Sequence, residues 1–295
     1  MNAAPITAVV VGTGAMAPEI AAACAAAGMP VTIAGRSAGR AAEARARAAA
    51  LGAAGVGSAA IEPGAFAGAG LVIETVVEDP AVKRELLARL EPWCADDAVI
   101  ATNTSSLRIE DLAGALARPG RFGGLHFLKP AHLTAVVEVV PGPRTDAATT
   151  DALRAVAAAM GKEPLVVRRD APGFIWNRIQ FAVLRECLHM LEAGVADARD
   201  IDAAVSDGLA PRWMAAGPLA TADLGGLPTF SLIAAQLFPH LASGAAAPAA
   251  LTGRAAAGEA FAPWTAEAGA AVADLRAEAL ARGRAIAARR RELGA

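Results

Sequence analysis

The chain lacks tyrosine and has little lysine or asparagine. Of its 295 residues none is Tyr, and only three are Lys and three Asn, whereas 81 are Ala and 29 are Gly. Arginine supplies 24 of the 27 basic residues. Because amino acids with GC-rich codons are favoured, we infer a GC-rich, bacterial genome. Each lysine and asparagine that remains despite this bias is therefore an informative position.

Cysteines and long apolar runs are also scarce. The three cysteines (Cys24, Cys94 and Cys187) are odd in number and scattered, which argues against a disulfide framework or a metal cluster and favours a reducing cytoplasm. No run of about 18 or more apolar residues, the length that a membrane-spanning helix needs, is free of charge, Gly and Pro. Glu19 interrupts the first apolar stretch, which has no basic start, so a signal peptide is not expected. These features predict a cytoplasmic protein.

Neither sign of charge is in excess. The chain has 27 basic and 29 acidic residues, a formal net charge of −2 and an isoelectric point near 6.1. No overall field therefore attracts nucleic acid or an anionic membrane. The composition favours a small-molecule substrate as the partner.

The pattern of apolar runs predicts an α/β fold. At about 150 residues per domain, the length suggests two domains. In the first, short apolar runs alternate with helical segments, which is typical of a parallel, doubly wound Rossmann sheet covered on both faces. The expected strands are residues 6–11, 30–34, 71–75, 98–102, 121–127, 135–140 and 165–167. The expected helices follow the first strand to residue 28 and then span residues 40–51, 81–90 and 147–160.

Beyond Pro172 the signals become helical. Helices are expected over residues 174–192, 199–206, 221–237 and 265–292, with a loose loop over residues 241–260 that is rich in Ala, Gly and Pro. We therefore predict a dinucleotide-binding Rossmann domain over residues 1–170 and an all-α C-terminal domain over residues 171–295.

A glycine turn follows the first strand and opens a helix, which is the context a dinucleotide site requires. It reads Gly12-Thr13-Gly14-Ala15-Met16-Ala17. Gly12 permits the tight turn, Gly14 lets the backbone approach a pyrophosphate, and the small Ala17 allows close helix–strand packing. The N-terminus of the helix offers N–H groups and a positive dipole end to phosphates. Residues 12–16 are therefore predicted to bind a dinucleotide.

The end of the second strand indicates which dinucleotide binds. An NAD site places Asp or Glu there to bind the ribose 2′-hydroxyl, but residues 35–36 contain no acid. Arg36 offers a cation, and Ser37 a hydrogen-bond donor, to a 2′-phosphate. The sequence thus favours NADP over NAD. The alternative is a surface arginine above a degenerate NAD site.

Three later segments carry polar residues in an ordered pattern: Thr102–Leu107, His126–Val140 and Asp170–Arg178. With the glycine turn, their order and spacing resemble the 3-hydroxyacyl-CoA dehydrogenase family, of the short-chain 3-hydroxybutyryl-CoA dehydrogenase type. The resemblance covers about residues 6–240 and fades after residue 227. It implies an oxidoreductase that uses NAD(P), acts on a short 3-hydroxyacyl thioester and forms a homodimer.

The residues themselves suit the same chemistry. Oxidising a secondary alcohol requires a base near pH 7, and a neutral imidazole serves well. His126 ends a predicted strand, where open α/β sheets place their ligands. Glu138 lies in the next strand, so a hairpin return would bring its carboxylate to the ring and fix the tautomer. His126 and Glu138 are predicted to be the acid–base pair.

The resemblance assigns further roles. It implies that Ser105 hydrogen-bonds the substrate oxygen and that Asn177, on the first helix of the second domain, contacts substrate from across the cleft. The alternatives are that Ser105 caps a turn and that Asn177 packs between domains. Asn103 resembles a residue that shapes the loop near the nicotinamide.

Two positively charged residues, Lys129 and Arg212, leave the class of substrate undecided. Lys129 stands where the family usually carries Asn, and Lys only donates and adds charge. This change fits a substrate with an extra negative charge, a retuned catalytic pair, impaired catalysis, or a lysine that turns toward solvent. Arg212, followed by Trp213, is similar to family members such as gulonate and carnitine dehydrogenases, and its guanidinium can hold a carboxylate at two points. A free hydroxy-acid dehydrogenase and a non-catalytic dinucleotide-binding protein therefore remain alternatives.

Overall fold

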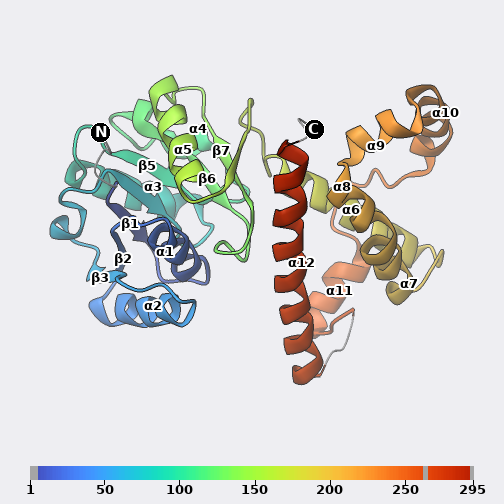
Figure 1. The fold of residues 1–295 in the computed structure, drawn as a ribbon, viewed down its shortest axis with the longest axis horizontal. Helices are drawn as coiled ribbons and strands as arrows, with labels where there is room; N and C mark the ends of the chain where they lie inside the picture. The colour runs from blue at the N-terminus through green and yellow to red at the C-terminus, as the bar shows by residue number, and fades with distance from the viewer. Residues whose placement is uncertain (1–5, 262–264, 293–295) are drawn as a thin grey trace. The chain divides into compact units, whose positions relative to one another are not determined.

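The computed structural model describes residues 6–261 and 265–292. Contacts between residues divide the chain into two units, one ending at Arg178 and the other beginning at Ile179. The first is an α/β unit and the second is helical (Figure 1). By these contacts residues 171–178 group with the first unit, whereas the C-terminal domain expected from the sequence begins at residue 171.

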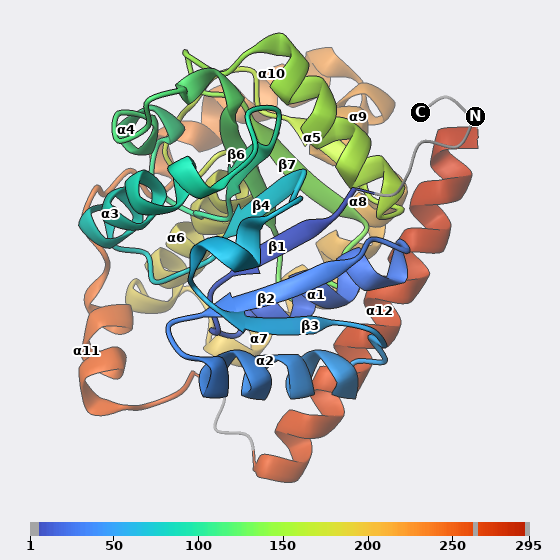
Figure 2. The same ribbon diagram turned by 90° about the vertical axis from the view of Figure 1, so that its left-hand side faces the viewer.

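The first unit is built on an eight-stranded sheet with the order β3-β2-β1-β4-β5-β6-β7-β8. Neighbouring strands are parallel except β6 and β7, so β7 and β8 run opposite to the other six. Figure 2 shows β3, β2, β1 and β4 following one another in this order across the sheet. Their bounds are Ala8–Val11 (β1), Val31–Gly35 (β2), Gly57–Ala60 (β3), Leu71–Glu74 (β4), Val99–Thr102 (β5), Phe122–Phe127 (β6), Val136–Val140 (β7) and Glu163–Val166 (β8).

Helices cover both faces of this sheet because its central strands are apolar on both sides. In β1, Ala8 and Val10 join one apolar core, and Val9 and Val11 join the other. Residues of α1, α2 and α5 complete the first core, and residues of α3 and α4 complete the second. These helices span Met16–Ala26 (α1), Ala38–Ala50 (α2), Pro80–Leu90 (α3), Ile109–Ala113 (α4) and Ala147–Ala159 (α5). Short 3₁₀ turns lie at Pro63–Phe66, Glu91–Trp93 and Pro119–Arg121.

The expected doubly wound sheet is confirmed, with one strand that the apolar runs of the sequence did not predict. This strand, β3, is an edge strand that reads Gly-Ser-Ala-Ala. Residues this small bury little apolar area and show no alternating pattern, so nothing in their sequence marks a strand. The short helix α4 was missed because its five residues are fewer than two turns and give no measurable periodicity.

The second unit is helical, as predicted, but the helix α8 (Ala210–Ala215) was not expected, and two further segments differ from expectation. The predicted helix 221–237 is two helices, because Gly226 adopts φ 88° between them and such a backbone breaks a helix. The predicted loop 241–260 contains the helix α11, whose alanines favour helix and which ends at Gly258 with φ 69°. The helices span Trp176–Glu192 (α6), Ala198–Ala203 (α7), Ala210–Ala215 (α8), Pro218–Gly225 (α9), Leu227–Leu237 (α10), Ala249–Ala257 (α11) and Ala266–Glu292 (α12), with a π-helical stretch at Ala204–Leu209 and a 3₁₀ turn at Phe238–His240.

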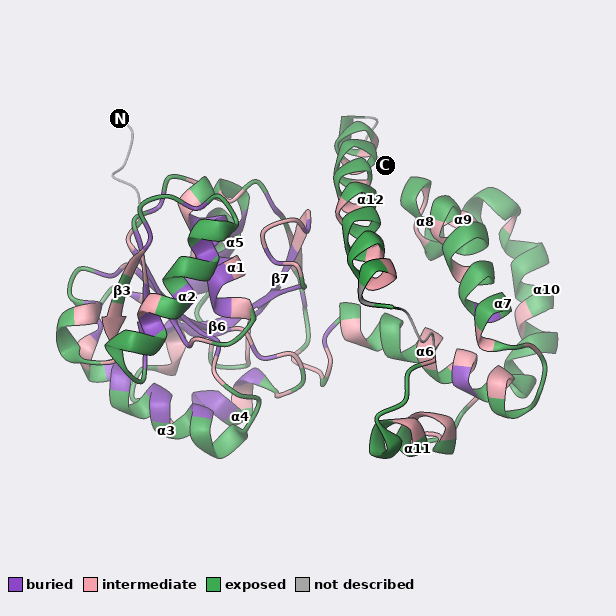
Figure 3. Cartoon of the chain, turned by 90° about the horizontal axis from the view of Figure 1, so that it is seen from below, coloured by how far each residue is buried: buried purple, intermediate pink, exposed green. Residues whose placement is uncertain are grey.

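Burial differs sharply between the units (Figure 3). Among the described residues of the second unit only Leu188 and Ile201 are buried. Leu219 and Leu224 of α9 are instead 84% and 82% exposed. No helix in the described residues is long and apolar enough to cross a membrane.

Candidate active site

The centre of the candidate site is a histidine–carboxylate pair on adjacent antiparallel strands. His126 of β6 and Glu138 of β7 are register partners, directly opposite each other. The Nδ1 atom of His126 lies 2.6 Å from Oε2 of Glu138, and both side chains are buried. The hairpin therefore brings together two residues that are separated by twelve positions in the sequence.

The other carboxylate oxygen of Glu138 holds the start of helix α6. Its Oε1 accepts hydrogen bonds from the backbone N–H groups of Ile175 and Trp176, at 2.8 and 2.9 Å. The chain reaches this position through two residues with left-handed backbone, Gly173 at φ 76° and Phe174 at φ 49°. These bonds explain why residues 171–178 belong to the first unit.

The surroundings of Glu138 keep it ionised. Burial raises the pKa of Glu138, but hydrogen bonds from His126 and from the N–H groups of Trp176 and Ile175 outweigh burial and leave that pKa below its usual value. An ionised carboxylate accepts, so Nδ1 of His126 carries the hydrogen and Nε2 of the neutral ring keeps its lone pair. Phe174 packs edge-on against the imidazole, with ring centroids 5.6 Å apart. The arrangement prepares Nε2 to accept a proton.

The loop after β5 lies beside this pair. The side-chain oxygen of Asn103 accepts a hydrogen bond from the N–H of Phe127 at 2.8 Å, and the N–H of Asn103 donates to the carbonyl of Glu74 at 2.7 Å. Nδ2 of Asn177 donates to the carbonyl of Ser105 at 3.0 Å. Asn103 thus ties the loop to the residue next to His126, and Asn177 holds the backbone of the same loop.

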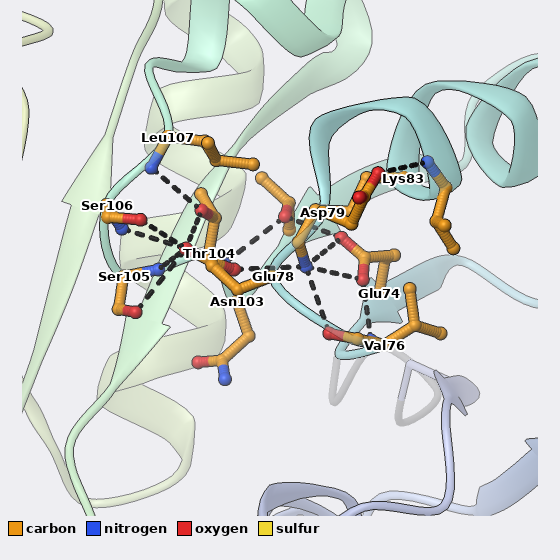
Figure 4. Close-up of polar contacts among 12 residues, drawn as sticks. Glu74, Val76, Glu78, Asp79, Lys83, Asn103, Thr104, Ser105, Ser106 and Leu107 are labelled. Atoms are coloured by element: carbon orange, nitrogen blue, oxygen red, sulfur yellow. Dashed lines mark hydrogen bonds and ion pairs between the residues drawn. The ribbon is translucent and has the colours of Figure 1, made fainter. Parts of the chain in front are cut away.

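Glu78 also belongs to this site, although the sequence pattern did not predict it as a site residue. Its carboxylate lies against the loop 104–106, and Lys83 lies behind it (Figure 4). Lys83 is 1% exposed and bonds both carboxylate oxygens of the fully buried Glu74. The signal that was available is the scarcity of lysine, since Lys83 is one of only three.

The glycine turn leaves room for a dinucleotide. Gly12 adopts φ 136°, and a Cβ there would lie 2.7 Å from the carbonyl oxygen of Thr75. A Cβ on the exposed Gly14 would meet nothing within 4 Å. Helix α1 begins at Met16, and its N-cap Ala15 makes no side-chain hydrogen bond. A pyrophosphate would fit here, because the backbone turns tightly at Gly12, the space beside Gly14 is open and the N-terminus of α1 has no side-chain cap.

The residues predicted to select the dinucleotide follow β2. Arg36 and Ser37 are exposed, and the hydroxyl of Ser37 accepts a hydrogen bond from the N–H of Arg40 at 3.3 Å as the N-cap of α2. That hydroxyl still has its own hydrogen to donate. Gly35 lies against the glycine turn, since a Cβ on it would be 2.7 Å from Cγ2 of Thr13. Arg36 and Ser37 therefore lie close to the glycine turn, because they follow Gly35 directly.

The two cations singled out from the sequence lie in different units. Lys129 is exposed and belongs to the loop after β6, which Lys162 holds through the carbonyls of Ala131 and Thr134 at 2.7 and 2.6 Å. Arg212 is exposed on α8 of the second unit. Five of the predicted site residues therefore lie in the first unit: His126, Glu138, Ser105, Asn103 and Asn177. Arg212 belongs to the second unit.

Comparisons with known proteins agree with the fold and the residue pattern. The NAD binding domain of 3-hydroxyacyl-CoA dehydrogenase matches residues 7–171, and the C-terminal domain of the same enzyme matches residues 173–262. A crystal structure of 5-formyl-3-hydroxy-2-methylpyridine 4-carboxylic acid 5-dehydrogenase, described as an NAD⁺-dependent dismutase, is 28% identical with a TM-score of 0.87. That match covers 97% of this chain and 98% of the solved one.

Two curated relatives are similar over part of this chain. The human mitochondrial hydroxyacyl-coenzyme A dehydrogenase is 40% identical over 163 residues, 55% of this chain and 51% of that protein. The L-carnitine dehydrogenase of Streptomyces griseus is 40% identical over 162 residues, 55% of this chain and 48% of that protein. The matches therefore span about half the length of these relatives. Two family domains in the expected order cover most of the sequence, and the chain belongs to the 3-hydroxyacyl-CoA dehydrogenase family.

Proposed function

We propose that the chain is an NAD(P)-dependent dehydrogenase that oxidises or forms the C3 hydroxyl of a short 3-hydroxyacyl thioester, carried on CoA or on a carrier protein. The observation that carries this proposal is the contact between Nδ1 of His126 and the ionised Glu138 at the end of β6. It is supported by a glycine turn in the same unit that fits a dinucleotide.

The proposed mechanism assigns proton transfer to His126. When bound, a nicotinamide supplies or accepts the hydride. In oxidation, Nε2 of His126 takes the hydroxyl proton, and in reduction it returns a proton to the keto oxygen. Glu138 holds the ring and stabilises the imidazolium. Ser105 donates its hydroxyl hydrogen to the substrate oxygen, and Asn177 contacts the substrate from the first turns of α6. Asn103 shapes the loop near the nicotinamide.

For the dinucleotide, we propose NADP in preference to NAD. Residues 35–36 carry no acid, and the exposed Arg36 is available to a 2′-phosphate. The family description names NAD for the first domain, so the preference is a property proposed for this chain alone. Ser37 would add a hydrogen bond to the same phosphate.

A second candidate is a dehydrogenase of a free hydroxy-acid. Relatives named for carnitine and for a pyridine carboxylate favour it, as do the exposed cations Lys129 and Arg212. Arg212→Ala would then raise KM for the acid about 10-fold or more, because a bidentate charged pair is lost. An unchanged KM would remove Arg212 from the proposal.

The proposed assembly is a homodimer in the cytoplasm. Exposed leucines on α9 and α10 of the second unit, including Leu219, Leu224 and Leu232, form the kind of apolar surface that a second copy covers. The free thiols of the three cysteines fit a reducing compartment.

The test is dinucleotide oxidation by the purified protein at neutral pH. Acetoacetyl-CoA, its carrier-protein thioester and small 3-oxo acids are each supplied with NADPH or NADH. We expect acetoacetyl-CoA to be reduced, and faster with NADPH. Reduction of the acids alone would favour the second candidate. Dinucleotide binding without reduction of any of these compounds would indicate a catalytically impaired binding protein.

A further inference from the structure

We propose that Arg47 is a second binding residue, besides Arg36, for the 2′-phosphate of NADP, and that the carbonyl of Thr13 holds it at the glycine turn. This inference rests on the proposed preference for NADP and adds a residue that the sequence pattern did not predict. Nη2 of Arg47 donates to the carbonyl oxygen of Thr13 at 2.5 Å, across 34 positions of the sequence. The exposed side chain of Arg47 is therefore tied to the turn that is predicted to bind the dinucleotide.

Thr13 also fills the place of the acid that an NAD site needs. Such an acid stands at the end of the second strand, where this chain has Gly35, the last residue of β2. A Cβ on Gly35 would lie 2.7 Å from Cγ2 of Thr13, 3.1 Å from the backbone nitrogen of Ala41 and 3.2 Å from its Cβ. The methyl group of Thr13 and the start of α2 therefore leave no room for a carboxylate side chain at position 35.

Thr13 connects the two parts of the dinucleotide site. In sites of this type the glycine turn approaches the pyrophosphate, and the end of the second strand approaches the ribose 2′ position. The carbonyl of Thr13 belongs to the turn, and its methyl group lies against Gly35. Helices α1 and α2, which follow these two parts, contact each other (Figure 2). A guanidinium bonded to the carbonyl of Thr13 is therefore expected beside the ribose that carries the 2′-phosphate.

Positive charge is concentrated in this part of the chain. Residues 36–50 contain four arginines and one glutamate, although the whole chain has a formal net charge of −2. A phosphate monoester carries a charge of about −1.5 to −2 at neutral pH. One guanidinium therefore neutralises only part of a 2′-phosphate, whereas Arg36 and Arg47 together match its charge.

The bond to the turn does not prevent Arg47 from binding a phosphate. A guanidinium has about five N–H donors in a fixed planar arrangement, and the carbonyl of Thr13 accepts from Nη2. A phosphate can accept from other N–H groups of the same guanidinium. Because the bond to Thr13 already orients the side chain, less conformational entropy is lost when the phosphate binds.

The first test compares the two dinucleotides by titration calorimetry. In Arg47→Ala we expect the Kd of NADPH to rise about 10-fold, as for the loss of a charged hydrogen bond, and the Kd of NADH to change less than about 2-fold. Arg45→Ala, at an exposed arginine of the same helix, should leave both constants unchanged. Equal weakening of both dinucleotides would overturn the proposal, because Arg47 would then support the turn or the pyrophosphate. Unchanged binding of NADPH would overturn it too.

The second test needs neither a nicotinamide nor turnover. Adenosine 2′,5′-bisphosphate and 5′-AMP differ only in the 2′-phosphate, so Arg47→Ala should weaken the first about 10-fold and the second less than about 2-fold. The loss should shrink at high salt, which screens exposed charges, and Arg47→Lys, which keeps the charge, should recover part of it.

The outcomes separate this proposal from the one on which it rests. If the wild type prefers the bisphosphate but Arg47→Ala binds it equally well, the role of Arg47 is wrong and the preference for NADP stands. If Arg47→Ala loses affinity only for the bisphosphate while the wild type binds NADH more tightly than NADPH, the role of Arg47 stands and the preference is wrong. The expected loss in a protein that reduces no substrate would refute the proposed dehydrogenase activity alone.

Discussion

The two units of the chain differ in what their interiors contain. The first buries ion pairs as well as apolar cores: Lys83 with Glu74, His126 with Glu138, and Arg121 with Glu91. In the described part of the second unit, only two residues are buried and large apolar side chains are exposed. The first unit therefore holds its polar groups in place by itself, whereas the second exposes large apolar side chains, as the proposed homodimer requires.

Replacing the buried lysine is expected to have the largest effect on the first unit. Lys83→Met leaves the carboxylate of Glu74 buried without its cation, and breaking a buried pair this way costs about 3–5 kcal/mol of unfolding free energy. Arg84→Met, at an exposed position on the same helix, should change it by less than about 0.5 kcal/mol. Chemical denaturation measures both. Similar values for the two variants would mean that the buried pair does not stabilise the unit.

Neutralising Glu138 should lower activity and change the response to acid. Glu138→Gln is expected to reduce kcat about 100-fold, because the imidazolium loses its counter-charge. The pKa of Glu138 in the folded protein lies below its usual value of 4.5, so its stabilising contribution is full above that value and is lost as the pH falls through the folded pKa. Below pH 4.5 the wild type should therefore lose stability more steeply than the variant. Parallel acid-denaturation curves would contradict this.

A charge on the apolar surface should affect the second unit and its partner. Leu224 is 82% exposed, and burying a leucine is worth about 1.5–3 kcal/mol. Leu224→Glu should therefore weaken a homodimer roughly 10- to 100-fold, as measured by sedimentation at several concentrations. Leu51→Glu, at a 40% exposed leucine of the first unit, is the control. If the two variants dissociate alike, α9 does not lie in the interface.

The smallest effect is expected at Arg36, directly after β2. Arg36→Ala should lower the preference for NADPH over NADH about 10-fold, because one charged contact to the 2′-phosphate is lost. Arg45→Ala, exposed on α2, should leave the preference unchanged. Dissociation constants for both dinucleotides give the ratio. NADH binding as tightly as NADPH to the wild type would remove the proposed role of Arg36.

The two units also differ in how far their sequences predicted them. The apolar runs of β1, β4 and β5 predicted buried strands, because continuous apolar residues suit a sheet covered on both faces. The small residues of β3 show no such pattern. In the second unit, alanine dominates helices and loops alike, so composition could not separate α11 from a loop, and only the backbone of Gly226 divides α9 from α10.

Within the site, contacts between side chains were easier to predict than contacts with the backbone. The pairing of His126 with Glu138 follows from strand alternation and a hairpin. Glu78 bonds loop N–H groups, and Asn177 bonds the carbonyl of Ser105. Every residue has these backbone groups, so residue type and spacing do not identify such partners. The scarcity of lysine and asparagine was the remaining clue, and Lys83, Asn103 and Asn177 all lie in this region.

The catalytic role of His126 is tested most directly by hydride transfer in His126→Ala. Wild type and variant, each saturated with NADPH, are mixed with acetoacetyl-CoA, and dinucleotide oxidation is followed in a single turnover. We expect a loss of about 10²- to 10⁴-fold, with the Kd for NADPH unchanged and with wild-type rates for His240→Ala, an exposed histidine of the second unit. A His126→Ala protein that reduces the substrate as fast as the wild type would contradict this role.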